Sequence, residues 1–217
     1  DNGGTWGGDN YNAGMRGCKG TPWIGGPRAS SFWYFPHHFK PKTVDVLAGH
    51  IDVFPTLAEL SGYQLPEGLS SQIDGVSLLP LLTGEETELE DRMIISHVGR
   101  WPDGEGQVDA HKYTYCSVHW KNYLLVRSQT CGNKDCVGNC RIFYQVINGR
   151  NDVAYSKNAG FHYAALFTDK WTLYDIKNDG ENSHDIVSQH PDIVKKMSDE
   201  FEQWWNEVYP HIHRKAE

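Results

Sequence analysis

The residues best suited to chemistry lie at the start of the chain, in a glycine-rich stretch that runs from Asp1 to Arg28. Asp1 and Asn2 carry the hard oxygen donors that calcium and magnesium require. Lys19 stands between small neighbours in RGCKG, where a compact cation can approach an oxyanion. Glycine tolerates backbone conformations that other residues resist, so such a stretch can bring main chain close to an ion. The alternative is an ordinary solvated turn, because Asp-Asn-Gly and isolated lysines are common in turns.

The order of these motifs along the chain identifies a family more specifically than any single motif does. DNG is followed by RGCKG, by a double glycine before Arg28, and by an apolar run that ends at Pro36. Further motifs are HIDVFPTLAELSGY at 50–63, IDGVSLLPLLTGE at 73–85 and the closing LYDIKNDGENSHDI. In this order and spacing the chain resembles the C-terminal third of the type I sulfatases, which belong to the alkaline-phosphatase superfamily. The resemblance covers most of the chain apart from roughly residues 128–168.

The resemblance implies hydrolysis of sulfate esters by a formylglycine nucleophile with the help of calcium. By motif match, Asp1 and Asn2 resemble calcium ligands, and Lys19 resembles the lysine that contacts the sulfate and the nucleophile. The sulfate oxygens must be held by preorganised cations while the ester bond breaks. No C/S-x-P-x-R motif, the source of formylglycine, occurs here, and Cys18 is followed by Lys-Gly-Thr instead. We therefore expect the chain alone to be inactive and to need an N-terminal part of the same enzyme.

A second group of candidate residues surrounds the sequence HVGRWPDG and the glycine-rich loop after it. In related enzymes this region contributes to the substrate pocket, so the resemblance implies a sulfated small molecule or glycan as substrate. A tryptophan here could stack on a sugar face, and a cationic side chain could meet a carboxylate or a second sulfate. The alternative is a polar surface loop. The group consists of His97, Arg100, Trp101, His111 and Lys112.

The five cysteines include a cluster of three, Cys131, Cys136 and Cys140, in the sequence TCGNKDCVGNC. In a secreted hydrolase we expect at least one disulfide here, which could reach Cys116. The alternatives are free thiols or a zinc site with His119 as the fourth ligand.

Composition limits the range of partners. The chain has 217 residues, of which 39% are hydrophobic and 12% aromatic, so it can form a packed core. Its formal net charge of −8 argues against nucleic acid as a partner. No apolar run reaches the ~18–20 residues that a membrane span needs. The resemblance implies a periplasmic or extracellular location.

The hydrophobic pattern predicts an α/β fold in two parts. We expect a buried strand at 29–36 and a helix from Asp52 to about Ser61. The helix is expected to pack through the face that carries Phe54, Leu57, Ala58 and Ser61. By the resemblance, residues 1–89 complete the large mixed α/β sheet of the sulfatase catalytic domain, and the acidic stretch 85–91 is a linker. Residues 90–217 are expected to form an antiparallel C-terminal subdomain.

That second part has the clearer pattern. Strands are expected at 93–98 and 171–176, and two more within 112–127 joined by a turn at Lys121-Asn122. A terminal helix begins at Pro191, and its apolar residues recur every three or four positions. We expect Met197, Phe201 and either Trp204 or Trp205 to pack on the antiparallel sheet.

Two rival functions remain open at this point. One is a phosphatase or phosphonate monoester hydrolase of the same superfamily, which would use two metals, whereas the lysine in RGCKG favours a sulfatase. The other is a non-catalytic glycan-binding fragment. The coding sequence upstream of Asp1 distinguishes these hypotheses, because a C/S-x-P-x-R motif there identifies a sulfatase.

Overall fold

The computed structural model describes residues 2–4, 11, 13–138, 140 and 168–212. These residues form two compact units. The first unit comprises residues 30–94, and the second comprises residues 2–29 together with those described from 95 onward.

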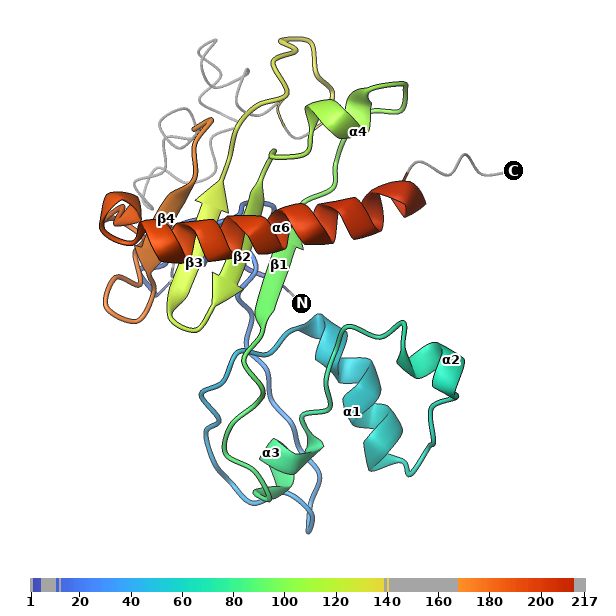
Figure 1. The fold of residues 1–217 in the computed structure, drawn as a ribbon. Coiled ribbons are helices and arrows are strands. Elements are labelled where there is room, and N and C mark those ends of the chain that lie inside the picture. Colours follow the sequence, from blue (N-terminus) through green and yellow to red (C-terminus); the bar gives the residue numbers. More distant parts are fainter. Residues whose placement is uncertain (1, 5–10, 12, 139, 141–167, 213–217) are drawn as a thin grey trace. The chain divides into compact units, whose positions relative to one another are not determined.

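A four-stranded sheet with the strand order β1-β2-β3-β4 forms the centre of the C-terminal part (Figure 1). Its strands are β1 (Met93–His97), β2 (Cys116–Trp120), β3 (Tyr123–Arg127) and β4 (Thr172–Asp175). Strands β2, β3 and β4 pair antiparallel, with Leu124 opposite both His119 and Tyr174. Lys121 turns the β2–β3 hairpin with a left-handed φ of 53°. The strand predictions for this part are confirmed, although the segment before Cys116 forms turns instead.

Helix α6 (Pro191–Ile212) lies across one face of the sheet (Figure 1). Met197, Phe201 and Trp205 are buried along it, with exposed fractions of 0%, 0% and 3%. The Phe201 ring lies 5.4 Å from that of Trp171 and 5.6 Å from that of Tyr113. The prediction of a packed aromatic helix is therefore confirmed.

None of the helices in the described part of the chain is long and apolar enough to cross a membrane.

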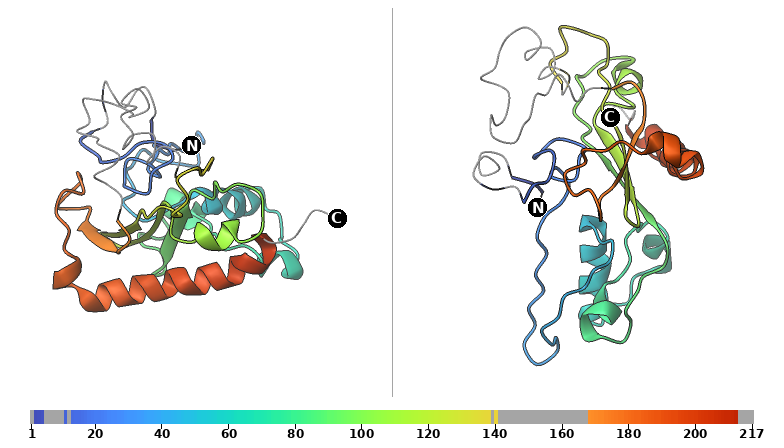
Figure 2. Two further views of the ribbon diagram at one scale, coloured as in Figure 1. Left: turned by 90° about the horizontal axis from the view of Figure 1, so that it is seen from above. Right: turned by 90° about the vertical axis from the view of Figure 1, so that its left-hand side faces the viewer.

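The N-terminal residues cover the opposite face of the same sheet (Figure 2). Successive side chains of a strand point to opposite faces of the sheet, so Leu124 and Val126 lie on the face opposite to that of Leu125. Trp23 and Ile24 form a buried cluster with Leu124, Val126 and Tyr174. Because of this packing, residues 2–29 belong to the second compact unit, whereas the sequence analysis groups them with the first. Whether residues 1–89 complete a catalytic sheet in a longer protein stays a prediction.

The first unit is organised around a buried carboxylate. Its helical elements are η2 (His50–Asp52), α1 (Val53–Leu60), α2 (Glu67–Ser70) and α3 (Leu79–Thr83). Asp52 is fully buried and accepts hydrogen bonds from the backbone N–H groups of Gly49, at 2.7 Å, and Val76, at 3.0 Å. Arg92 donates to both of its oxygens at 2.6 Å. Burial alone would raise the pKa of Asp52, but these bonds outweigh it and hold the pKa below its ordinary value.

Two expectations for this unit are wrong. Residues 29–36 form no strand and are mostly exposed, because an extended segment needs a partner strand for its backbone groups and none pairs with it among the described residues. Helix α1 forms and Ala58 is buried as expected, but Phe54 and Leu57 are 52% and 49% exposed. Its buried face instead includes Thr56, whose hydroxyl donates to the carbonyl of Asp52 and accepts from the backbone N–H of Leu78.

Candidate functional site

The glycine-rich turn closes on itself through main-chain hydrogen bonds. The backbone N–H of Gly3 donates to the carbonyl oxygen of Gly26 at 2.8 Å. The backbone N–H of Lys19 donates to the carbonyl oxygen of Gly4 at 3.1 Å. These bonds hold the segment that carries Asn2 beside the loop that carries Lys19, whose side chain is exposed. Asp1 lies outside the described residues.

Two of the glycines are required by close backbone approach. A Cβ atom added to Gly3 would lie 1.7 Å from the carbonyl oxygen of Gly25. One added to Gly26 would lie 2.0 Å from the carbonyl oxygen of Thr21. Contacts this short exclude any side chain. These glycines are therefore required by the conformation of the turn.

The turn is anchored on the sheet by residues that the sequence analysis did not single out. Arg16 donates to the carbonyl oxygen of Asn182 at 2.8 Å and to the hydroxyl of Tyr174 at 3.2 Å. Its guanidinium carbon lies 4.8 Å from the centre of the Trp23 ring, within cation–π range. The Asn182 side chain, which is fully buried, accepts from the backbone N–H of Ile24 at 3.2 Å. Lys19 thus projects from a turn whose base is fixed.

The loop after β1 presents Arg100 and Trp101. The Arg100 side chain is exposed, and Trp101 is half-buried. The Trp101 ring lies 5.7 Å from the ring of His97 and 6.5 Å from that of Trp205. These contacts fix the position of Trp101 at the edge of the α6 aromatic cluster. The substrate role of both residues stays a prediction.

The His97 side chain contacts the backbone of this loop and of the segment before β2. Its Nε2 lies 3.1 Å from the carbonyl oxygen of Lys112, and its Nδ1 accepts from the backbone N–H of Gly99 at 2.9 Å. This pattern fits a neutral ring with the proton on Nε2. Burial lowers the pKa of His97, which favours the same neutral form. His97 therefore acts in the structure as a support for the loop.

Lys112 is held in an ion pair. Its Nζ lies 2.5 Å from Oε2 of Glu202 in α6, and the Tyr113 hydroxyl donates to the other oxygen of that carboxylate. Burial would raise the pKa of Glu202, but the bonds from Lys112 and Tyr113 outweigh it and lower the pKa. The charge of Lys112 is therefore already paired. Contact with a substrate stays a prediction for this residue.

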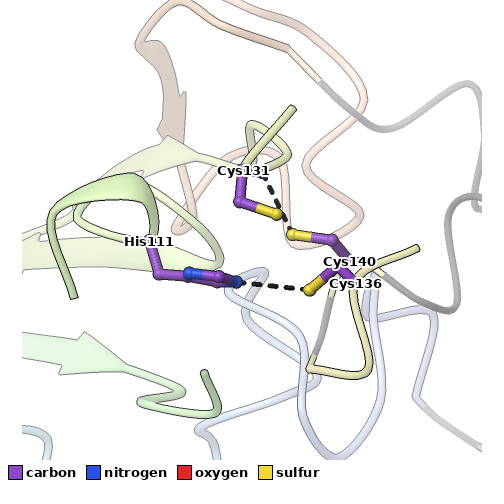
Figure 3. A group of neighbouring side chains, drawn as sticks. All are labelled: His111, Cys131, Cys136 and Cys140. Atoms are coloured by element: carbon purple, nitrogen blue, oxygen red, sulfur yellow. Dashed lines mark hydrogen bonds between the residues drawn. The ribbon is translucent and has the colours of Figure 1, made fainter. Parts of the chain in front are cut away.

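His111 lies in the cysteine cluster and is fully buried (Figure 3). It follows α4 (Gln107–Ala110), a short helix that the hydrophobic pattern does not reveal. All five cysteines are free, so the expected disulfide is absent from the structure. Cys116 lies in β2, where its thiol donates to the carbonyl oxygen of Arg127. His119 was the predicted fourth ligand, but its Nε2 lies 3.1 Å from the carbonyl oxygen of Lys121 instead.

Comparisons with known proteins give relatives over part of the chain. Bovine (Bos taurus) arylsulfatase A is 36% identical over 113 residues, which are 48% of this chain and 21% of that protein. A sulfatase of Formosa agariphila is 24% identical over 214 residues, which are 94% of this chain and 31% of that protein. No family model matches the chain.

A solved structure supports the fold. It comes from work on the metabolism of multiple glycosaminoglycans by Bacteroides thetaiotaomicron and superposes with a TM-score of 0.59 at 18% identity. The match covers 88% of this chain and 32% of the other. The chain thus spans between about a fifth and a third of the length of these proteins.

Proposed function

We propose that this chain, which is similar to sulfatases over a C-terminal region of them, completes the sulfate-binding site of a longer enzyme. In that enzyme Lys19 contacts a sulfate oxygen, and the ester is cleaved by a formylglycine that the preceding part of the protein supplies. The chain alone lacks this nucleophile and is inactive. The reaction is hydrolysis of a sulfate ester.

One observation supports the proposal most strongly, namely the closed glycine turn. Its main-chain bonds bring the Asn2 segment next to the Lys19 loop, although 17 positions separate the two residues. The negative charge on the sulfate oxygens must be stabilised by cations as the ester bond breaks. Lys19 is one such cation, and the Asn2 oxygen can hold a metal ion that serves as another. The anchoring of this turn by Arg16 and Asn182 holds the Lys19 backbone in place before any ligand arrives.

Calcium is the metal that we propose for the complete site. The carboxamide oxygen of Asn2 is a donor of the kind that calcium takes, and the carboxylate of Asp1 is another. A calcium ion takes about six to eight oxygen ligands, so these two residues can supply only part of the shell. When bound, the ion would neutralise charge on the sulfate oxygens. Asn2 and Asp1 would hold one side of it.

The substrate that we propose is a sulfated carbohydrate. Trp101 offers a flat aromatic face, and Arg100 offers an exposed guanidinium in the same loop. A sugar ring can stack on the former while the latter pairs with a carboxylate or second sulfate. The predicted group also contains His111 and Lys112. In the structure His111 is fully buried and Lys112 is paired with Glu202, so the proposed contact with the sugar rests on Arg100 and Trp101. The glycosaminoglycan context of the structural neighbour agrees with this class of substrate.

We expect the longer enzyme to be periplasmic or extracellular, where polymeric sulfated sugars are available to it. The N-terminal part of the same protein is then the principal partner of this chain. That part would supply the nucleophile and the remaining calcium ligands.

The test is to replace Lys19 in the longer protein and measure turnover of an aryl sulfate and of sulfated sugars. Removing one preorganised donor of an oxyanion typically lowers kcat by about 10²–10³-fold, and we expect a loss of this size for Lys19→Ala. Lys177→Ala is the matched control, because Lys177 is also an exposed lysine in a turn but lies elsewhere. Full activity of Lys19→Ala would overturn the site assignment.

A further inference from the structure

Four side chains that can bind a metal converge next to α4, outside the proposed sulfate site (Figure 3). His111, Cys131, Cys136 and Cys140 each offer one ligand atom, and all four atoms lie within 4.8 Å of one another. Cys131 is half-buried and the other three are buried. Nε2 of His111 and Sγ of Cys136 are 3.4 Å apart. Three thiols and one imidazole are thus gathered in one place, and none of them belongs to the Lys19 turn.

We propose that these four residues form a structural zinc site. Zinc takes four ligands in a tetrahedron, with Zn–S bonds of about 2.3 Å and Zn–N bonds of about 2.0–2.1 Å. Ligand atoms in such a tetrahedron are about 3.5–3.8 Å apart, by geometry from those bond lengths. The observed cluster therefore needs only small side-chain movements to enclose the ion. Three thiolates and one imidazole are a common donor set for structural zinc.

The histidine is already oriented as a ligand. Its Nδ1 lies 2.7 Å from the carbonyl oxygen of Gln107 in α4, and a proton on Nδ1 satisfies that bond. Nε2 then carries the lone pair, and it faces Sγ of Cys136 (Figure 3). Zinc-bound histidines usually donate the other ring N–H to a backbone carbonyl or a carboxylate in this way. The burial of His111 also removes it from competing contacts with solvent.

Backbone N–H groups point at two of the sulfur atoms. Cys131 donates from its backbone to Sγ of Cys140 at 3.1 Å, and Gly138 donates to Sγ of Cys136 at 3.3 Å. Hydrogen bonds to a ligating sulfur stabilise the negative charge that it carries when bound to zinc. The spacing supports the same conclusion, because four residues separate Cys131 from Cys136 and three separate Cys136 from Cys140. Such short separations let one loop supply three ligands.

A disulfide explains these contacts less completely. Pairing any two of the three cysteines would leave the third as a free thiol. It would also give no role to the buried imidazole that lies beside Cys136. A bound metal uses all four groups and holds the thiolates apart from one another.

The zinc would order the loop that carries Arg100 and Trp101. A Cβ atom on Gly138 would lie 2.6 Å from the carbonyl oxygen of Arg100 and 3.3 Å from Cα of Trp101. The cysteine loop therefore packs its backbone directly on that segment. With four protein ligands the site has no open position for a substrate, so its role is structural.

The first experiment measures zinc in the full 217-residue chain, expressed in zinc-supplemented medium and purified without chelator. We expect a single zinc ion per chain, lost in Cys136→Ser and in Cys140→Ser. Cys18→Ser and Cys116→Ala are the matched controls, because both cysteines are buried outside the cluster and should leave the zinc content unchanged. Zinc that persists in both cluster variants would overturn the proposal.

The second experiment uses the unmutated chain, so it does not depend on how the variants fold. Zinc is exchanged for cobalt, and the absorption spectrum is recorded. We expect thiolate-to-cobalt charge-transfer bands and the intense visible bands of tetrahedral cobalt. An octahedral spectrum without thiolate bands would contradict the proposal. So would a metal-free chain in which peptide mapping finds a disulfide between two of the three cysteines.

Discussion

The two compact units bury their aromatic residues very differently. In the second unit the sheet is covered on both faces, and Trp23, Phe201 and Trp205 are at most 3% exposed. In the first unit Phe32 and Tyr34 are 93% and 89% exposed. The first unit buries small and aliphatic side chains such as Leu78 and Leu81 beside the polar contacts of Asp52. Hydrophobic spacing therefore predicts burial only where the chain also supplies the surface that covers the apolar side chains.

Replacing a core aromatic in the second unit is the largest effect that we predict. Trp205→Ala should lower the free energy of unfolding by about 3–5 kcal/mol, because it removes a buried ring and leaves a cavity. Phe32→Ala is the matched control in the first unit, and its effect should stay within about 0.5 kcal/mol. Urea unfolding followed by circular dichroism measures both. Equal effects of the two substitutions would remove the contrast between the units.

Breaking the buried ion pair should destabilise the first unit somewhat less. Arg92→Met leaves Asp52 buried without its charge partner, and loss of one partner of a buried pair costs about 3–5 kcal/mol. Because the Arg92 side chain is 15% exposed, we expect the lower end of that range. Asp45→Asn changes an exposed carboxylate of the same unit and should have almost no effect. Hydrogen exchange of the α1 amides reports on this unit alone.

Acid should affect the first unit through the same carboxylate. The pKa of Asp52 is lower in the folded state than in the unfolded chain. The pair therefore stabilises the fold above the ordinary aspartate pKa of about 3.9, and this contribution disappears as the pH falls through the lowered value. We expect Arg92→Met to flatten the acid side of the stability profile of α1. A profile that is unchanged by this substitution would contradict the assignment.

The anchor of the glycine turn should show a smaller effect. Asn182→Gly keeps the left-handed backbone, whose φ is 49°, and removes the oxygen that accepts from Ile24. Leaving a buried donor without its partner costs about 1–3 kcal/mol. Asn178→Gly is the matched control, because Asn178 is an exposed asparagine in the turn that follows β4. We expect faster exchange of the Ile24 amide only in Asn182→Gly.

The sequence predicted those elements whose partners lie within the same chain. The spacing in α6 and the Lys121 turn identified the helix and the β2–β3 hairpin because the strands and the helix cover one another. The run 29–36 looked like a buried strand, yet no described strand pairs with it. The burial of Thr56 rather than Phe54 in α1 depends on a polar network between distant segments, which local spacing does not reveal.

Part of the candidate site could likewise be predicted from the sequence, and part could not. Lys19 and the glycines stood out, since their order along the chain is specific. Asn182 and Arg16 did not, because their role arises only when the turn packs on the sheet. The cysteine cluster was noticed, but its partner His111 comes from a segment 20 residues upstream of Cys131, and the sequence pointed to His119 instead.

We propose that this chain supplies part of a sulfate site and not a complete one. The most direct test is to assay aryl sulfate turnover by the isolated 217-residue chain and by the longer protein, at equal concentration and with added calcium. We predict turnover by the longer protein and none by the isolated chain. Hydrolysis by the isolated chain, or its absence from the longer protein, would contradict the account.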